Sequence, residues 1–280
     1  MEEIRRVAVV NDLSGFGRCS LTVSIPILSA MGFQVCPVPT AVLSSHTGYP
    51  DPLIRDFSGD MQAYLAHWER LGLTFACGYT GFLGDKRQAE ILVPFLTRLR
   101  EQGALRLVDP AMADHGRLYA SCSPDLVPAM AKLVAMADVA TPNLTELCLM
   151  MGEDYETVVT ADDCMTRVEQ MARRLLKEGC GAVVVTGVVR DDRIENCVLS
   201  SVEADPQWVG GHRVEQNFAG TGDVFASVLC GWLLRGEELS AAVEKTVAFV
   251  CKTTAVTAEM HVNGQDGIAF EPYLRDLCEE

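Results

Sequence analysis

The segment that decides the fold is VAVVNDLSGFGRCSLTVSIPILSAMGFQVCPVPTAVL, residues 7–43. It opens with a short apolar run at residues 7–10, which is typical of a buried strand. A helical pattern follows from Leu21 to Met31 and ends at Gly32, and a second extended segment runs from Val35 to Leu43. This order of strand, helix and strand predicts a βαβ unit, whose two strands lie parallel in one sheet.

The same alternation continues along nearly the whole chain. Further strands are predicted at Thr74–Cys77, Arg106–Asp109, Val139–Thr141 and Ala182–Thr186. Helices are predicted at Asp60–Leu71, Lys86–Gln102, Asp125–Met136, Asp162–Glu178, Val224–Leu234 and Ser240–Glu259, with Thr160–Asp163 as the cap of the fourth. Residues 188–216 instead alternate polar and apolar side chains, which predicts an antiparallel hairpin or meander at the sheet edge. We therefore expect an α/β fold with a mostly parallel sheet, helices on both faces and an antiparallel edge segment, in a single domain spanning residues 1–280.

Composition excludes several classes of protein. The formal net charge of −15 argues against nucleic acid as a partner, because phosphate backbones need a basic surface. The 11 cysteines form no Cys-x-x-Cys pair, and several lie in apolar segments, which indicates reduced core thiols rather than disulfides or a zinc site. No run is apolar enough for a membrane span, and the N-terminal residues do not resemble a signal peptide. We expect a cytoplasmic protein with no membrane partner.

The strongest functional signal is the turn Gly220-Thr221-Gly222-Asp223, which leads into the apolar helix 224–234. The unpaired N–H groups at the start of a helix and its positive dipole end favour an anion. Asp223 would place a carboxylate beside that anion, which suggests a general base rather than a phosphate ligand. A helix start with an acid in its first turn would explain Asp223 equally well, but it would not explain glycine on both sides of Thr221.

Two other phosphate-binding motifs fail. Gly15-Phe16-Gly17 follows the first strand, as in a dinucleotide-binding fold, but Ser20 stands at the third glycine position. The ribose-binding acid is also missing, since no Asp or Glu occurs between Asp12 and Asp51. The P-loop is excluded because the chain contains no Gly-Lys pair.

Polar side chains follow the predicted strands, and we expect them to converge at the carboxyl edge of the sheet, where ligands bind in such folds. They are Asn11-Asp12, Ser44–Gly48, Asp109, Asn143 with Glu146, and Thr186-Gly187. Asn143 and Glu146 have the spacing of a helix capping box, and Glu146 could equally hold a water molecule of a Mg²⁺ ion. Phe82 lies between two glycines, in Gly81-Phe82-Leu83-Gly84, so its ring could face a pocket and stack on a flat substrate.

Together these residues resemble the ribokinase superfamily and, within it, the pyridoxal kinase family. Gly220–Asp223 is similar to the family's anion hole and catalytic aspartate, and the segments Asp109–Asp114 and Thr141–Glu146 are similar to its nucleotide-side motifs. Ser45-His46-Thr47 and Gly81–Gly84 are similar to the segments around the pyridine ring. The resemblance extends along nearly the entire chain.

The resemblance implies an enzyme that phosphorylates the 5′-hydroxymethyl group of pyridoxal, pyridoxamine or pyridoxine with ATP and Mg²⁺, with a monovalent cation as a further candidate cofactor. Asp223 would be the base and the backbone of Gly220, Thr221 and Gly222 the anion hole. The implied substrate-binding residues are Asp12, Ser45, His46, Thr47 and Phe82. The implied nucleotide-binding residues are Asp109, Asn143, Glu146 and Thr186, of which Asp109 and Glu146 would also bind the metal through water. A homodimer is expected from the same resemblance.

Two features leave the substrate open. Asp12, in Asp-x-Ser-Gly, stands where pyridoxal kinases usually carry Ser and is similar to the hydroxymethylpyrimidine kinases of thiamine synthesis. Phe82 replaces a common Tyr, which removes a hydroxyl and keeps a flat face. Hydroxymethylpyrimidine kinase is therefore the alternative enzyme, and a non-catalytic sensor of B6 or nucleotides is the alternative outside enzymes.

Overall fold

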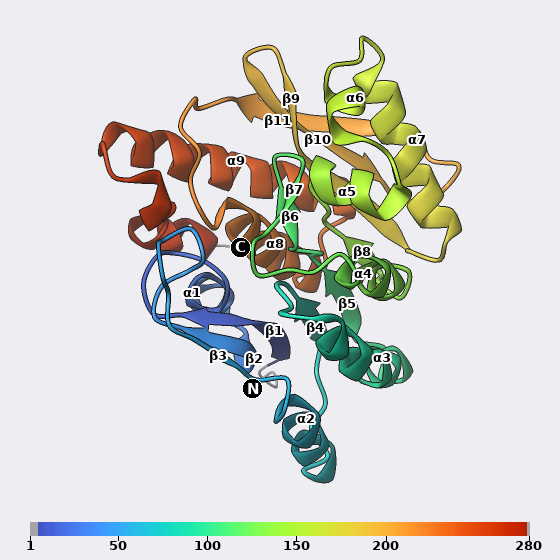
Figure 1. Ribbon diagram of the computed structural model, residues 1–280, viewed down its shortest axis with the longest axis vertical. Coiled ribbons are helices and arrows are strands. Elements are labelled where there is room, and N and C mark those ends of the chain that lie inside the picture. Colours follow the sequence, from blue (N-terminus) through green and yellow to red (C-terminus); the bar gives the residue numbers. More distant parts are fainter. Residues whose placement is uncertain (1–4, 279–280) are drawn as a thin grey trace.

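The computed structural model describes residues 5–278, and a nine-stranded sheet forms its centre (Figure 1). The strands lie in the order β11-β10-β9-β8-β5-β4-β1-β2-β3. Their bounds are β1 Arg6–Ser14, β2 Gln34–Leu43, β3 Ile54–Asp56, β4 Cys77–Thr80, β5 Leu105–Val108, β8 Val139–Ala140, β9 Ala182–Arg190, β10 Arg193–Leu199 and β11 Gln207–His212. All pairs from β2 to β9 are parallel, whereas β3, β10 and β11 are antiparallel to their neighbours. The predicted α/β fold with an antiparallel edge is confirmed.

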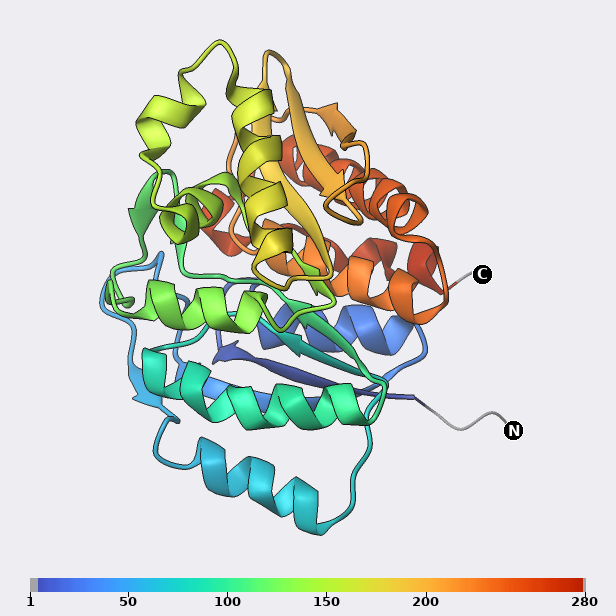
Figure 2. The same cartoon turned by 90° about the vertical axis from the view of Figure 1, so that its right-hand side faces the viewer.

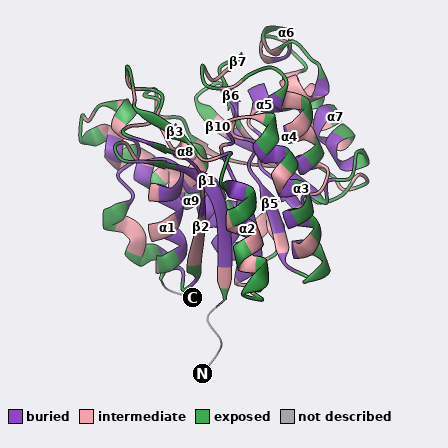
Figure 3. Cartoon of the chain, turned by 60° about the horizontal axis from the view of Figure 1, so that its bottom comes forward, coloured by how far each residue is buried: buried purple, intermediate pink, exposed green. Residues whose placement is uncertain are grey.

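Helices cover both faces of the sheet (Figure 2). The helices are α1 Leu21–Ala30, α2 Met61–Arg70, α3 Lys86–Glu101, α4 Leu126–Val134, α5 Leu144–Met151, α6 Tyr155–Val159, α7 Cys164–Lys177, α8 Thr221–Leu234 and α9 Leu239–Glu259, with short 3₁₀ turns η1 Gly264–Asp266 and η2 Glu271–Leu277. Ala8 and Val10 of β1 pack with α2 to α7, while Val7 and Val9 pack with α1, α8 and α9. This division of alternate strand residues makes two cores, and both are buried between helices and sheet (Figure 3).

Two predicted elements begin elsewhere in the structure. The strand expected at Thr74–Cys77 is β4, which begins at Cys77 and ends at Thr80. The strand contains Gly78 and two polar side chains, so it does not form an apolar run in the sequence. Glycine is needed at position 78 because a Cβ there would lie 2.2 Å from the Leu99 side chain. The helix expected from Asp162 begins at Cys164, and Asp163 accepts a hydrogen bond from Arg167 instead of capping the helix.

Four short elements were not predicted, and one strand, β9, extends beyond its predicted end. β3, α6 and the hairpin of β6 Ala113–Asp114 and β7 Arg117–Leu118 were not predicted. β9 continues past Thr186 to Arg190, because it pairs with β10 there after its contact with β8 has ended. The two prolines of β2 are tolerated because β3 pairs only with residues 41–43 and leaves the proline-containing stretch at an edge. Within residues 5–278, no helix is long and apolar enough to cross a membrane.

Candidate active site

The structure brings the carboxyl ends of the central strands and the start of α8 together. Asn11, inside the C-terminal half of β1, donates a hydrogen bond of 3.0 Å from its side-chain amide to Oδ1 of Asp223 in the first turn of α8. The charge of Asp223 also raises the pKa of Asp109, which directly follows β5. These contacts join segments more than 100 residues apart at one edge of the sheet, as predicted for an open α/β fold.

The start of α8 has the backbone geometry of an anion site. Gly220 caps the helix with a φ of 71°, and a Cβ there would lie 2.0 Å from the Arg18 carbonyl oxygen, so only glycine fits. Gly222 differs, since a Cβ added to it would meet no protein atom within 4 Å. Internal packing therefore explains Gly220 but not Gly222. Open space beside a free first-turn N–H suits the close approach of a ligand to the backbone.

Asp223 is a partly buried carboxylate whose pKa is raised to about 6. Desolvation is the main cause, and the charge of Asp12 adds to it. A backbone hydrogen bond from Ser20 and the amide of Asn11 oppose the rise. A carboxylate with a pKa close to 6 is a stronger base than an ordinary aspartate and is still ionised at neutral pH.

Asp109 and Glu146 form a second, fully buried acidic pair. Burial and the charge of Asp223 raise the pKa of Asp109 to about 8, with the Thr141 hydroxyl acting in the opposite direction. Burial and the charge of Asp109 raise the pKa of Glu146 well above its ordinary value. Two carboxyl groups that disfavour each other's charge fit a site for a cation, and oxygen ligands are those that Mg²⁺ prefers. Within residues 5–278 no group of three acidic, His or Cys side chains could hold a metal directly.

Asn143 and Glu146 also form the predicted capping box of α5. Asn143 Oδ1 accepts the Glu146 N–H at 2.9 Å, and Glu146 Oε2 accepts the Asn143 N–H at 2.9 Å. Glu146 Oε1 accepts the Met112 N–H at 3.1 Å, so backbone groups hold both oxygens in place. Thr186 pairs with Asn143 through an isolated parallel bridge, which brings these two predicted nucleotide-binding residues together.

Asp12 is buried, and hydroxyl groups of the protein bind both of its carboxylate oxygens. Ser14 Oγ donates to Oδ2 at 2.8 Å, and Ser20 Oγ donates to Oδ1 at 2.5 Å. Burial raises the pKa of Asp12, while these two hydrogen bonds and the nearby His46 lower it. The carboxylate therefore fixes the conformation of the segment between β1 and α1 through Ser14 and Ser20.

His46 lies in the segment after β2, wedged between two glycines. A Cβ on Gly17 would lie 2.3 Å from the ring, and one on Gly48 would lie 2.7 Å from it. Nδ1 accepts the Gly48 N–H at 3.0 Å, so the proton sits on Nε2, which lies 2.7 Å from the Gln265 carbonyl oxygen. The protein thus occupies both ring nitrogens and leaves the ring itself as the surface that a substrate could contact.

The other predicted substrate residues are accessible. Ser45 and Phe82 are partly exposed and Thr47 is exposed. The Phe82 N–H donates to Asn11 Oδ1 at 2.9 Å, which ties the backbone of Phe82 to the end of β1. None of these three side chains is needed to fill the core, which suits a surface that receives a ligand.

Known proteins with this combination of fold and residues are kinases. The phosphomethylpyrimidine kinase family matches residues 72–269. A pyridoxine/pyridoxal/pyridoxamine kinase from Bordetella avium is 34% identical over 258 residues, which cover 86% of this chain and 82% of that protein. The chain belongs to the pyridoxal kinase family.

Solved structures place this pyridoxal kinase family member within the ribokinase-like fold. A pyridoxal kinase from Lactobacillus plantarum superposes with a TM-score of 0.87 at 31% identity and covers 98% of this chain and 97% of its own. A Bacteroides thetaiotaomicron protein, provisionally called a phosphomethylpyrimidine kinase and solved with pyridoxal, has a TM-score of 0.93 at 37% identity, covering 99% and 96%. The family and the phosphotransferase class predicted from the sequence are confirmed.

Three contributors to the site of this family member were not predicted from the sequence. Asn11 was expected only at this edge of the sheet, and its side chain binds Asp223. Gln265 binds His46, and the hydroxyl of Tyr49 donates to Asp266. The partners of all three lie more than 200 residues away along the chain, so no local spacing could reveal the contacts.

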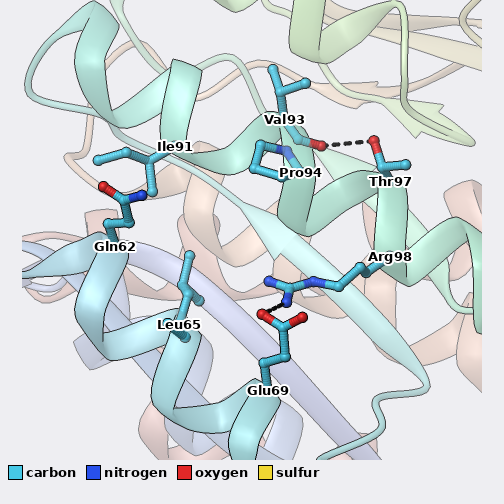
Figure 4. Close-up of a pocket in the computed structure, with 9 residues that line it drawn as sticks. Gln62, Leu65, Glu69, Ile91, Val93, Pro94, Thr97 and Arg98 are labelled. Atoms are coloured by element: carbon cyan, nitrogen blue, oxygen red, sulfur yellow. Dashed lines mark hydrogen bonds and ion pairs between the residues drawn. The ribbon is translucent and has the colours of Figure 1, made fainter.

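A separate groove lies between α2 and α3 on the outside of this kinase (Figure 4). It has a volume of about 660 Å³ and is lined by Leu65, Ile91 and Pro94 among others, with an ion pair between Glu69 and Arg98. None of the predicted site residues lines it. Its only charged lining residues, Glu69 and Arg98, neutralise each other in an ion pair, and the rest of the lining is mostly apolar.

Proposed function

We propose that this protein transfers the γ-phosphoryl group of ATP to the 5′-hydroxymethyl group of a B6 vitamer. The observation that carries the proposal is the carboxylate of Asp223, with a pKa raised to about 6, in the first turn of a helix whose Gly222 faces open space. The names of the relatives support the vitamer, since they include a pyridoxine/pyridoxal/pyridoxamine kinase and a structure solved with pyridoxal.

The proposed reaction moves one proton and one phosphoryl group. Asp223 takes the proton from the hydroxymethyl oxygen as that oxygen forms a bond to the γ-phosphorus. The bond from the γ-phosphorus to the bridging oxygen breaks, and ADP leaves with the electron pair. Backbone N–H groups of Gly220, Thr221 and Gly222 stabilise the negative charge on the transferred group. Mg²⁺, when bound, would neutralise the phosphates, with Asp109 and Glu146 holding its water shell.

The remaining roles follow the position of each side chain. Asn143 and Thr186 lie beside the acidic pair and are proposed to contact the phosphates of the nucleotide. Asp12, Ser45, His46, Thr47 and Phe82 are proposed to hold the flat ring. The homodimer and the requirement for a monovalent cation stay predictions.

The second candidate is hydroxymethylpyrimidine kinase. It is favoured by Asp12, a buried carboxylate near the proposed ring site, and by the match to the phosphomethylpyrimidine kinase family. A carboxylate would suit either a protonated pyridine nitrogen or a substrate amine. The two functions therefore differ in the ring that is phosphorylated and share the same phosphoryl chemistry.

A direct assay separates these functions. The protein is incubated with Mg-ATP and, separately, pyridoxal, pyridoxamine, pyridoxine and hydroxymethylpyrimidine, and ADP is measured. We expect ADP with at least one B6 vitamer. Turnover with hydroxymethylpyrimidine alone would replace the proposal with the second candidate, and no turnover with any of the four would favour a non-catalytic sensor.

The pKa of Asp223 predicts the pH dependence of the reaction. A base works only when ionised, so kcat/KM for the vitamer should fall as the pH drops below about 6. Above that pH, ionisation of Asp223 should no longer change kcat/KM. The measurement is kcat/KM at saturating Mg-ATP between pH 5 and pH 8, ranges chosen to span about one unit below and two above that pKa. An acid limb near the ordinary pKa of aspartate, about 4, would contradict the raised value.

A further inference from the structure

Asn11 is a fully buried side chain in the C-terminal half of β1 that binds three separate parts of the site. Its Oδ1 accepts the N–H of Asp12 at 3.0 Å and the N–H of Phe82 at 2.9 Å. Its Nδ2 donates to Asp223 Oδ1 at 3.0 Å. It is 0% exposed, so it cannot contact solvent or serve as a substrate ligand itself.

The orientation of this amide is fixed by chemistry. Backbone N–H groups can only donate, so the two at one end of the amide require its oxygen there. The NH₂ end must then face Asp223, where it can only donate, so that Oδ1 of Asp223 is held as an acceptor. Gly81 closes the remaining space, since a Cβ there would lie 2.3 Å from Asn11 Nδ2. The amide is therefore locked toward the carboxylate.

We propose that Asn11 is a positioning residue that orients the carboxylate of Asp223 and keeps it ionised for proton transfer. This inference rests on the proposed function, in which Asp223 is the base. A hydrogen bond to the charged form of a carboxylate stabilises that form, and it also fixes the direction in which the acid accepts a proton. The same side chain holds the backbone of Phe82, so it couples the base to the proposed ring-stacking residue.

Among the residues that the structure describes, the other side chains that act on Asp223 do not duplicate this effect. Asp12 on β1 and Asp109 after β5 are acids whose charge interacts unfavourably with that of Asp223. The Cys19 thiol before α1 and the Tyr79 hydroxyl on β4 are neutral, and the charge of Asp223 raises the pKa of both. The backbone N–H of Ser20 is a further donor. Asn11 is thus the side chain that donates a hydrogen bond to a carboxylate near two other acids, Asp12 and Asp109.

Asn11→Asp separates the proposed role from a purely structural one. An aspartate has the same shape and can still accept the N–H groups of Asp12 and Phe82, but it presents an oxygen instead of an N–H to Asp223. Two carboxylates at this distance share a proton, so the acid limb of kcat should move up by about one pH unit or more. We expect kcat at pH 7 to fall by about twofold for a shift of one pH unit and by about tenfold for a shift of two, and to recover toward the wild-type value at alkaline pH, with the KM for ATP unchanged. The measurement is the pH profile of kcat beside that of the wild-type protein.

Three comparisons make the outcome decisive. Asn196→Asp puts a carboxylate at another buried asparagine, whose amide binds Val209 and Gly187, and it should leave the acid limb in place. Asn11→Ala removes the donor without adding a charge and should move the limb upward by less, which tests the proposal even if Asn11→Asp does not fold. Thermal unfolding checks the fold of each variant.

The inference and the proposed function fail in different ways. A loss of activity in Asn11→Asp and Asn11→Ala that is equal at every pH, with the acid limb unmoved, would show that Asn11 only holds the backbone. Near-normal turnover in Asp223→Asn would instead overturn Asp223 as the base and leave the Asn11 contact without a catalytic role.

Discussion

Asp223→Asn should reduce kcat by about 10²–10⁴-fold, because the substituted amide cannot accept the proton of the hydroxymethyl group. The KM for ATP should stay close to that of the wild-type protein, since the first-turn N–H groups of α8 are unchanged. Thermal stability should be equal or higher at pH 7 to 8. The pKa of Asp223 is about 6 in the folded protein and therefore higher than in the unfolded chain. The ionised carboxylate opposes folding, and this destabilisation is fully present once the pH exceeds about 6. Steady-state kinetics test the expected loss of kcat, and a thermal unfolding curve at the same pH tests the expected stability.

A matched control for this variant is Asp60→Asn. Asp60 is an exposed acid at the start of α2 and makes no capping hydrogen bond with its side chain, so its loss should change neither kcat nor the pH profile. Residual activity of Asp223→Asn should also lack the acid limb near pH 6, because the group that titrates there is gone. Turnover within a few-fold of the wild-type value, with the limb retained, would assign the limb to another group and remove Asp223 from the mechanism.

The parts of this site that could be predicted from the sequence are those formed by residues that are neighbours along the chain. The turn 220–223 predicted an anion site because glycine, acid and apolar helix stand side by side. The capping box of Asn143 and Glu146 is likewise a pattern of four consecutive residues, and the structure contains it. Both rely on backbone groups at the start of a helix, whose needs are local and the same in every fold.

The parts that the sequence could not reveal depend on tertiary contacts. The sequence singled out Asp12 as a charged residue expected just after the first strand, yet the neighbouring Asn11 makes the bond to the proposed base. Nothing in a single sequence distinguishes these two adjacent residues, because the choice depends on Asp223, 212 positions away. Likewise β4 was misplaced because its glycine and polar residues are explained only by Leu99 of α3 and by the strands beside it.

Gly222→Ala should raise the thermal stability of the protein and lower its kcat. Alanine is the better helix former, and its methyl group would meet no protein atom within 4 Å, so we expect the thermal midpoint to rise by about 1–3 °C. The same methyl group would fill the space beside the first-turn N–H groups, where we propose that the transferred phosphoryl group lies. Because a misplaced anion-hole contact costs about as much as a lost one, kcat should fall on the order of 10²-fold. Thermal unfolding without ligand and kinetics with Mg-ATP and the vitamer are the two measurements.

Gly231→Ala, in the same helix, should show the opposite pair of effects. A Cβ at Gly231 would lie 2.1 Å from Met31 Sδ in the core between α1 and α8, so the thermal midpoint should fall while kcat stays near the wild-type value. Opposite signs at two glycines of one helix cannot arise from helix propensity, because both replacements are the same. A Gly222→Ala variant with higher stability and normal kcat would mean that no ligand approaches this backbone, and the anion hole would have to be sought elsewhere on the rim.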